Sequence, residues 1–373
     1  MAVELKGRAH LWSLDDTLNE LDYLARTAGA QVVGRITQQA NRLTSLFLGK
    51  GKIQEVKERA VEWEADTVIF DDELTPSQQR NLEETLGTKV IDRTALILDV
   101  FARHARTYEG QLQVELAQHK YLLPRLAGQW SHLERLGGGI GTRGPGETQL
   151  ETDRRLVRRR IGKIESDLEG VRRRRTLYMG RRKKASIPTA SLVGYTNAGK
   201  STLFNALSDA RVEAEDQLFS TLDPVTRRVR LPSGGQLLLT DTVGFIQKLS
   251  PMVVAAFRAT LEELAESDIL LHVIDITHPK APEQTEVVEN VLKDLGLGDQ
   301  PRLLVINKMD LLAPANEGAT PARRSGWDSH SSVLISAAKG WNLDLLLQEV
   351  ESRLTATGGA SGAGKMAGSN ARS

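Results

Sequence analysis

The chain has 373 residues, of which 40% are hydrophobic and 26% are charged, and this composition excludes an intrinsically disordered protein. It contains no cysteine, which excludes disulfides, thiolate metal sites and cysteine nucleophiles. No apolar run approaches the roughly 20 residues of a membrane helix, and the N-terminus lacks the apolar stretch of a signal peptide, so we expect no membrane span and a cytoplasmic location.

The first predicted domain, residues 1–108, is a small α/β domain, because strand and helix patterns alternate along it. Helical patterns cover residues 14–28, 53–65, 75–87 and 95–104. Strand-forming segments cover residues 31–36, 66–70 and 89–91. Thr75 supplies a capping oxygen for the third helix, which ends at Gly87. Strands that are separated by helices form parallel βα units, so we expect parallel pairing here.

The strands stop in the second predicted domain, residues 109–187, where helical stretches flank a glycine-rich loop at 137–146. The first stretch covers residues 111–123. The second has the 4-3-4-3 apolar spacing of a coiled-coil seam from Val157 onward, with apolar residues at Leu150, Val157, Ile161, Ile164, Leu168 and Val171. An antiparallel helical hairpin is the simplest arrangement. The loop is either a phosphate-binding tip or a flexible hinge, because its spacing matches neither a P-loop nor a dinucleotide fingerprint.

The net charge of +1 conceals a strongly basic segment. Residues 154–184 contain fourteen lysines and arginines against three acidic residues, a local net charge of +11, so the rest of the chain carries −10. A solvated helix face is the ordinary explanation of a charge run. Clustering this dense favours a polyanionic partner, because a basic stripe attracts phosphates.

Strands and helices alternate again in the third predicted domain, residues 188–356, and we expect the small-residue tail that follows, residues 357–373, to be disordered. A strand at 190–193 and a helix at 202–207 enclose a loop with the GxxxxGK[ST] pattern of P-loop NTPases. The loop consists of Gly194, Tyr195, Thr196, Asn197, Ala198, Gly199, Lys200 and Ser201. Its backbone N–H groups converge on the phosphates, while Lys200 reaches the β- and γ-phosphates and the Ser201 hydroxyl binds Mg²⁺.

Two further segments supply phosphate and metal contacts. A strand at 236–240 ends in the run Asp241, Thr242, Val243 and Gly244. Asp241 can hold Mg²⁺ through water, and the Gly244 amide can meet the γ-phosphate. Between the phosphate motifs lies a loop with Phe219, Ser220, Thr221, Leu222 and Asp223. Taken alone Thr221 is an ordinary loop threonine, but its place in the chain favours a metal ligand. The predicted metal ligands are therefore Ser201, Thr221 and Asp241, and the predicted catalytic contacts are Lys200, Thr221 and Gly244.

The choice of base comes from two later segments. A strand at 302–306 leads to Asn307, Lys308, Met309 and Asp310. The Asp310 carboxylate can accept hydrogen bonds from both the ring N–H and the amino group of guanine, whereas adenine offers an acceptor in place of the ring N–H. A strand at 332–335 leads to Ser336, Ala337 and Ala338, whose backbone supports the guanine carbonyl. The ordered motifs together predict a GTP-binding protein.

These residues, with several segments outside the nucleotide motifs, resemble the HflX GTPases, a branch near the Obg group. The most specific match is residues 137–161, GGGIGTRGPGETQLETDRRLVRRRI, and further matches are residues 68–74, 113–117 and 219–224. The resemblance covers nearly all of residues 14–356 and implies an N-terminal α/β domain, a helical hairpin and a G domain. It also implies binding to the large ribosomal subunit and a role in splitting or rescuing stalled ribosomes. Some family members carry a further small domain, whereas only a tail follows Leu354 here.

Two positions bear on how GTP is hydrolysed. Many GTPases place a water-orienting glutamine directly after the DxxG glycine, but the residue here is Phe245, whose side chain can neither donate nor accept a hydrogen bond and can also be a buried anchor. We therefore expect slow hydrolysis that a partner accelerates. Asn197 matches a P-loop asparagine that helps to hold K⁺ in some related GTPases. The alternative is a loop asparagine that tolerates an unusual backbone angle.

Two functions remain open on the sequence. One is a GTPase switch that docks its basic hairpin on the rRNA of the large ribosomal subunit. The other is a GTPase switch for a protein or RNA-modifying partner, with the basic helix contacting some other anion. In both cases we expect a monomer that binds GTP and GDP with Mg²⁺.

Overall fold

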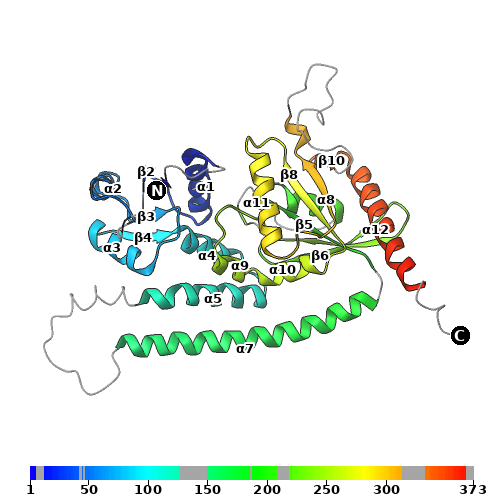
Figure 1. The fold of residues 1–373 in the computed structure, drawn as a ribbon, viewed down its shortest axis with the longest axis horizontal. Helices are drawn as coiled ribbons and strands as arrows, with labels where there is room; N and C mark the ends of the chain where they lie inside the picture. Colours follow the sequence, from blue (N-terminus) through cyan, green and yellow to red (C-terminus); the bar gives the residue numbers. More distant parts are fainter. Residues whose placement is uncertain are drawn as a thin grey trace. The chain divides into compact units, whose positions relative to one another are not determined.

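The computed structural model describes residues 1–5, 12–41, 44, 47–126, 149–184, 187–208, 218–219, 221–312 and 332–366 (Figure 1). The chain divides into two compact units. The first consists of Met1–Arg175 and Lys248–Arg258, and the second of Thr176–Gln247 and Ala259–Ser373. The short segment Lys248–Arg258, which the sequence analysis placed in the third domain, therefore groups with the N-terminal part of the chain.

Parallel strand pairs and flanking helices build the N-terminal part of the first unit, as predicted. Strand β1 (Ala2–Leu5) pairs with β2 (Thr37–Ala40), and β3 (Thr67–Phe70) pairs with β4 (Lys89–Asp92). The helices here are α1 (Leu14–Thr27), α2 (Lys50–Glu62), α3 (Pro76–Leu86) and α4 (Arg93–His104). The Thr75 hydroxyl accepts a hydrogen bond from the Gln78 N–H at 3.2 Å, and Gly87 ends α3 with a φ of 71°. Both predicted ends of α3 are thus confirmed.

One predicted strand, residues 31–36, is wrong. That segment has no strand pairing, and β2 begins at Thr37, opposite Ala2. Gly34 lies against the ring of Trp63, and a Cβ atom on Gly34 would collide with that ring. Packing of the segment against a side chain therefore replaces a backbone ladder over these residues, and the sequence pattern does not distinguish the two.

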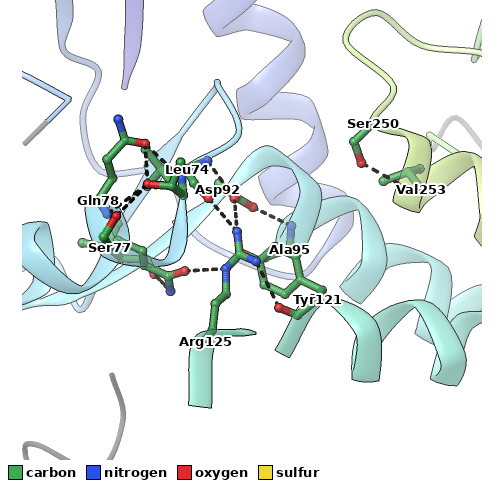
Figure 2. A network of polar contacts seen from close by, with 12 residues as sticks. Leu74, Ser77, Gln78, Asp92, Ala95, Tyr121, Arg125, Ser250 and Val253 are labelled. Carbon is green, nitrogen blue, oxygen red and sulfur yellow. Dashed lines mark hydrogen bonds and ion pairs between the residues drawn. The ribbon is translucent and has the colours of Figure 1, made fainter. Parts of the chain in front are cut away.

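A polar network joins the end of the next helix, α5 (Tyr108–Leu122), and the short helix η1 (Leu123–Arg125) to this domain (Figure 2). The Arg125 guanidinium donates to the Leu74 carbonyl at 2.6 Å and to Gln79 Oε1 at 3.0 Å. It also forms an ion pair with Asp92 at 3.4 Å and lies over the Tyr121 ring, 3.6 Å from its centroid. Asp92 also accepts the Leu74 N–H at 3.0 Å and caps α4. This one carboxylate therefore connects Leu74, the start of α4 and Arg125 of η1.

The long helix α7 (Gln149–Lys184) runs back alongside α5, which agrees with the predicted antiparallel pair (Figure 1). Ion pairs link them: Arg160 to Glu115 at 2.6 Å, and Lys120 to Glu165 at 2.7 Å. The predicted seam residues from Val157 to Val171 are buried or half-buried, and Ile164 is fully buried. The glycine-rich loop at 137–146 lies outside the described residues, so the hinge and phosphate-tip alternatives stay open.

The second unit is built on one sheet whose strand order is β10-β9-β8-β5-β7-β6. The strands are β5 (Thr189–Gly194), β6 (Val225–Arg230), β7 (Gln236–Asp241), β8 (Ile269–Asp275), β9 (Arg302–Asn307) and β10 (Ser332–Leu334). Among the strands that the structure describes here, β6 at the edge pairs antiparallel with β7, and the other neighbouring pairs are parallel. Parallel strands present their carboxyl ends at one edge, so the loops after β5, β7, β9 and β10 meet there.

Helices cover this sheet and complete its core. They are α8 (Lys200–Ser208), α10 (Arg258–Ala265), α11 (Ala281–Asp294) and α12 (Leu343–Met366), and a short helix η2 (Met309–Leu311) follows β9. Side chains of α8 and α12 pack on Ala190 and Leu192 of β5, whereas the intervening Ser191 belongs to the opposite side of the strand. Helix α9 (Pro251–Ala256) belongs to the first unit.

The C-terminal helix α12 corrects one expectation. It continues to Met366, so residues 357–366 of the predicted disordered tail are helical, and residues 367–373 lie outside the described part. Each residue added to a nucleated helix gains a backbone hydrogen bond, and the helix continues here although four glycines of low helix propensity lie in this stretch. Among the residues that the structure describes, no helix has the length and apolar character to cross a membrane.

Candidate functional site

The loop between β5 and α8 has the backbone of a phosphate-binding loop. Gly194 and Gly199 have φ values of 151° and 93°, and a Cβ atom on either would collide, with the Val273 carbonyl and the Asn307 amide respectively. Asn197 also has a positive φ, of 62°. These angles turn the chain sharply from the strand into the helix, whose N-terminus carries backbone N–H groups that are free to bind phosphate oxygens.

Lys200, the first residue of α8, is buried inside this loop. Its Nζ donates to the carbonyl oxygens of Gly194 at 3.2 Å and Tyr195 at 2.9 Å. Burial lowers the pKa of Lys200 to about 8, and the Asp241 carboxylate acts in the opposite direction. A phosphate placed against Nζ would stabilise the charged form, so the site is suited to bind an anion.

Three buried oxygen ligands meet beside Lys200. The hydroxyls of Ser201 and Thr221 lie 2.8 Å apart, and Thr221 Oγ1 donates to Asp241 Oδ2 at 2.9 Å. Burial raises the pKa of the Asp241 carboxyl, against the hydrogen bond from Ser201 and the charge of Lys200. Hydroxyl and carboxylate oxygens are the ligands that Mg²⁺ prefers, so the three predicted metal ligands form a set that fits this ion.

The run after β7 is joined to the phosphate-binding loop by backbone hydrogen bonds. The Thr196 N–H donates to the Phe245 carbonyl at 2.8 Å, and the Phe245 N–H donates to the Gly194 carbonyl at 3.0 Å. Gly244 faces Lys200 closely, since a Cβ atom there would lie 2.9 Å from Nζ. Phe245 is fully buried and therefore serves as the anchor considered in the sequence analysis.

The base-recognition segments lie at the same edge of the sheet. Asn307 Nδ2 donates to the Ala198 carbonyl at 3.0 Å, and its Oδ1 accepts the Ala337 N–H at 3.0 Å. The Ser336 hydroxyl donates to Asp310 Oδ1 at 2.6 Å. Asn307 therefore connects the phosphate-binding loop to the segment after β10, while Ser336 orients the Asp310 carboxylate.

The structure brings the predicted nucleotide residues together with one exception. Ser220 lies outside the described residues. Phe219, Thr221 and Leu222 are buried next to it in sequence, and Phe219 has a φ of 60°. Asp223 precedes β6, and the remaining predicted residues lie at or after the carboxyl ends of β5, β7, β9 and β10, the edge at which open α/β sheets bind ligands.

Sequence reasoning did not single out Asp275, which contacts the base-recognition segment. It ends β8, and its Oδ2 pairs with Lys308 Nζ at 2.7 Å. Lys308 has a φ of 67°, so the ion pair holds the base-recognition segment in an unusual backbone conformation. The signal was present, because residues 269–275 form an apolar run that ends in an aspartate directly beside β9.

Family models match most of the chain. The model described as "GTP-binding GTPase N-terminal" matches residues 15–102, and "GTP-binding GTPase Middle Region" matches residues 104–182. The model described as "50S ribosome-binding GTPase" matches residues 189–308. The three matches follow one another in the order of the predicted α/β domain, helical hairpin and G domain.

Several curated relatives are similar over nearly the whole chain. GTPase HflX of Caldanaerobacter subterraneus subsp. tengcongensis is 52% identical over 341 residues, which are 91% of this chain and 77% of the relative. GTPase HflX of Escherichia coli K12 is 48% identical over 342 residues, 91% of this chain and 79% of the relative. A GTP-binding protein from Sulfolobus solfataricus, solved in complex with GDP, is 25% identical with a TM-score of 0.47, covering 95% of this chain and 98% of that one.

Proposed function

The chain belongs to the HflX family of GTPases, and from that premise we propose that it is a GTP-controlled switch that binds the large ribosomal subunit. That the protein is a GTPase follows from its family and from the G-domain match. The finer proposal is that docking splits or rescues stalled ribosomes. Because ribosomes are its proposed partner, we propose a cytoplasmic location for the protein. We also propose that it is a monomer.

The nucleotide site supports a specific division of labour in hydrolysis. Bound Mg²⁺ supplies positive charge that neutralises the β- and γ-phosphates. Ser201, Thr221 and Asp241 would hold the ion, because their oxygens already converge. Lys200 would contact the β- and γ-phosphates, and the Gly244 N–H the γ-phosphate. The Asp310 carboxylate, oriented by Ser336, would recognise guanine.

The observation that carries the ribosomal proposal is the exposed basic face of α7. Arg154, Arg155, Arg158 and Arg159 line a shallow surface depression on this helix, together with Glu151. Arginine and lysine side chains on one helix face are the electrostatic footprint of a protein that binds a phosphate backbone. The description of the matched G-domain model, a 50S ribosome-binding GTPase, agrees with that partner.

Sedimentation with purified large ribosomal subunits tests the proposal. We expect the protein to sediment with them in a non-hydrolysable GTP analogue and much less in GDP, because GTP orders the loops around Thr221 and Gly244. In the same samples, the subunits should raise the rate of GTP hydrolysis, by as much as about 10³–10⁵-fold, since Phe245 leaves the attacking water without a glutamine.

Equal sedimentation in both nucleotides, or equal hydrolysis with and without subunits, would reject a ribosome-linked switch. Specific binding to a protein or an RNA-modifying enzyme in its place would support the alternative partner. Small ribosomal subunits serve as the matched control, because they offer rRNA of similar charge without the proposed docking site.

We also propose that Asn197 helps to hold a K⁺ ion near the phosphates. Its φ of 62° is equally what a loop asparagine adopts without an ion, so the proposal rests on its position in the loop. Hydrolysis measured in KCl and in NaCl at equal ionic strength should be faster in KCl, and Asn197→Ala should remove the difference. Equal rates of the unaltered protein in both salts would count against the ion.

A further inference from the structure

A buried hydroxyl beside the phosphate-binding loop, that of Thr196, has no hydrogen-bond partner among the described residues. Thr196 is the third residue of the loop, and only 6% of its surface is exposed. Buried hydroxyls in proteins are almost always hydrogen-bonded, because burial without a partner is costly. An unpaired hydroxyl in a site that binds a ligand therefore indicates a partner on the ligand or on its water.

The neighbours of Thr196 fix where this side chain lies. Its N–H is held by the Phe245 carbonyl at 2.8 Å. A Cβ atom on Gly244 would lie 2.8 Å from Thr196 Cγ2 and 2.9 Å from Lys200 Nζ. The Thr196 side chain thus lies where Gly244 and Lys200 converge, with its methyl group nearest to Gly244. The inference rests on the proposed function, in which these two groups contact the γ-phosphate.

Hydrolysis requires a group at that place which orients the attacking water, and the phenyl side chain of Phe245 cannot form a hydrogen bond. Gln247 is the other nearby candidate: its backbone N–H donates to the Tyr195 hydroxyl at 3.0 Å, and its side-chain Nε2 is unpaired among the described residues. Both side chains can donate and accept hydrogen bonds, because the Gln247 amide also carries an acceptor oxygen. Thr196 is favoured by its place, since its side chain lies against Gly244 and close to Lys200.

We propose that the Thr196 hydroxyl binds the attacking water, accepting a hydrogen bond from it and donating a hydrogen bond to a γ-phosphate oxygen. The water oxygen forms a bond to the γ-phosphorus while the bond from that phosphorus to the β–γ bridging oxygen breaks. One water proton passes to a γ-phosphate oxygen, and GDP leaves with the bridging oxygen. Thr196 keeps its proton throughout, so it orients the water without being consumed.

The test compares Thr196→Val, which replaces the hydroxyl by a methyl group, with Thr196→Ser, which keeps it. In full-length protein without ribosomes, the valine variant should lose roughly 10²-fold in kcat, as when one oxyanion-type contact is removed, with little change in KM. The serine variant should retain most of the rate. Affinity for GDP with aluminium fluoride, which imitates the transition state, should fall in the valine variant by a similar factor, while affinity for GDP alone is unchanged.

The control is Thr285→Val on α11, where the hydroxyl donates to the Ala281 carbonyl at 2.8 Å, far along the chain from the nucleotide motifs. It should hydrolyse GTP normally. The proposal is overturned if Thr196→Val keeps its rate, if it loses GDP affinity as much as transition-state affinity, or if Gln247→Leu alone abolishes hydrolysis. Because this test contains no ribosomes, a normal rate in Thr196→Val would not affect the proposal of ribosome binding. Likewise, a failure to sediment with ribosomal subunits would not affect the proposed role of Thr196.

Discussion

Asp310 shows how a single carboxylate acquires its specificity from neighbours. Its Oδ1 accepts the Ser336 hydroxyl at 2.6 Å, and the Ser336 oxygen in turn accepts the Lys339 N–H at 3.1 Å. The ion pair with Asp275 holds Lys308, which lies two residues before Asp310 in the same segment. The Asp310 carboxylate is therefore already oriented by its neighbours, and binding of guanine in the proposed way would require little reordering.

Replacing this carboxylate should change the base that the protein prefers. In Asp310→Asn, the side-chain amide donates to the second carbonyl of xanthine, whereas one of the hydrogen bonds to guanine is lost. We expect GTP affinity to fall by a factor that reaches about 10⁴ and xanthosine triphosphate affinity to rise. Fluorescence titration with both nucleotides measures the change. Asp344→Asn, at an exposed position in the first turn of α12, is the control, and unaltered GTP affinity in Asp310→Asn would contradict the assignment.

At the scale of elements, helix α7 packs against α5 with one face and presents basic side chains to solvent on another. Its seam, from Val157 to Val171, is buried or half-buried, and Arg160 is held by two hydrogen bonds to Glu115, at 2.6 and 2.8 Å. Arg158 and Arg159 are exposed, as is Arg160. The helix thus exposes arginines to solvent while its seam and the Arg160–Glu115 hydrogen bonds maintain the contact with α5.

Reversing the charge of the exposed arginines should weaken ribosome binding selectively. The double variant Arg158→Glu and Arg159→Glu should bind large subunits at least roughly tenfold more weakly and with a smaller dependence on salt, because fewer counterions are released. Sedimentation at several salt concentrations measures both effects. The double variant Lys57→Glu and Arg80→Glu makes the same charge change at exposed sites of α2 and α3 and should bind normally. Equal binding by both variants would leave the basic face as a solvated surface.

At the scale of the whole molecule, the chain itself links the nucleotide site to the N-terminal unit. It leaves the second unit after Gln247, directly beyond the Gly244 motif, and returns at Ala259. Within the first unit, Lys248 pairs with Asp71 and with Asp72, the latter at 2.6 Å. Burial lowers the pKa of Lys248, but the two carboxylates raise it by more, so the ammonium stays charged.

An aromatic contact completes the same attachment. Phe257, at the end of α9, meets Phe101 of α4 edge to face, with ring centroids 6.0 Å apart. The segment that follows the γ-phosphate motif is therefore packed as part of the N-terminal unit. The chain that follows Gly244 is therefore a covalent connection between the two units.

The amino-acid sequence by itself determined the nucleotide chemistry, because each motif is a short contiguous run whose own backbone and side chains act together. Gly194 to Ser201, and Asp310 after its strand, were identified in this way. Only the tertiary structure decided which distant groups meet. Thr221 reaches Asp241, Thr196 faces Gly244, and Lys248 joins Asp71, because the sheet order and the packing of α9 bring them together. None of these three contacts is encoded in local spacing, because long-range contacts depend on how whole elements bury their apolar faces.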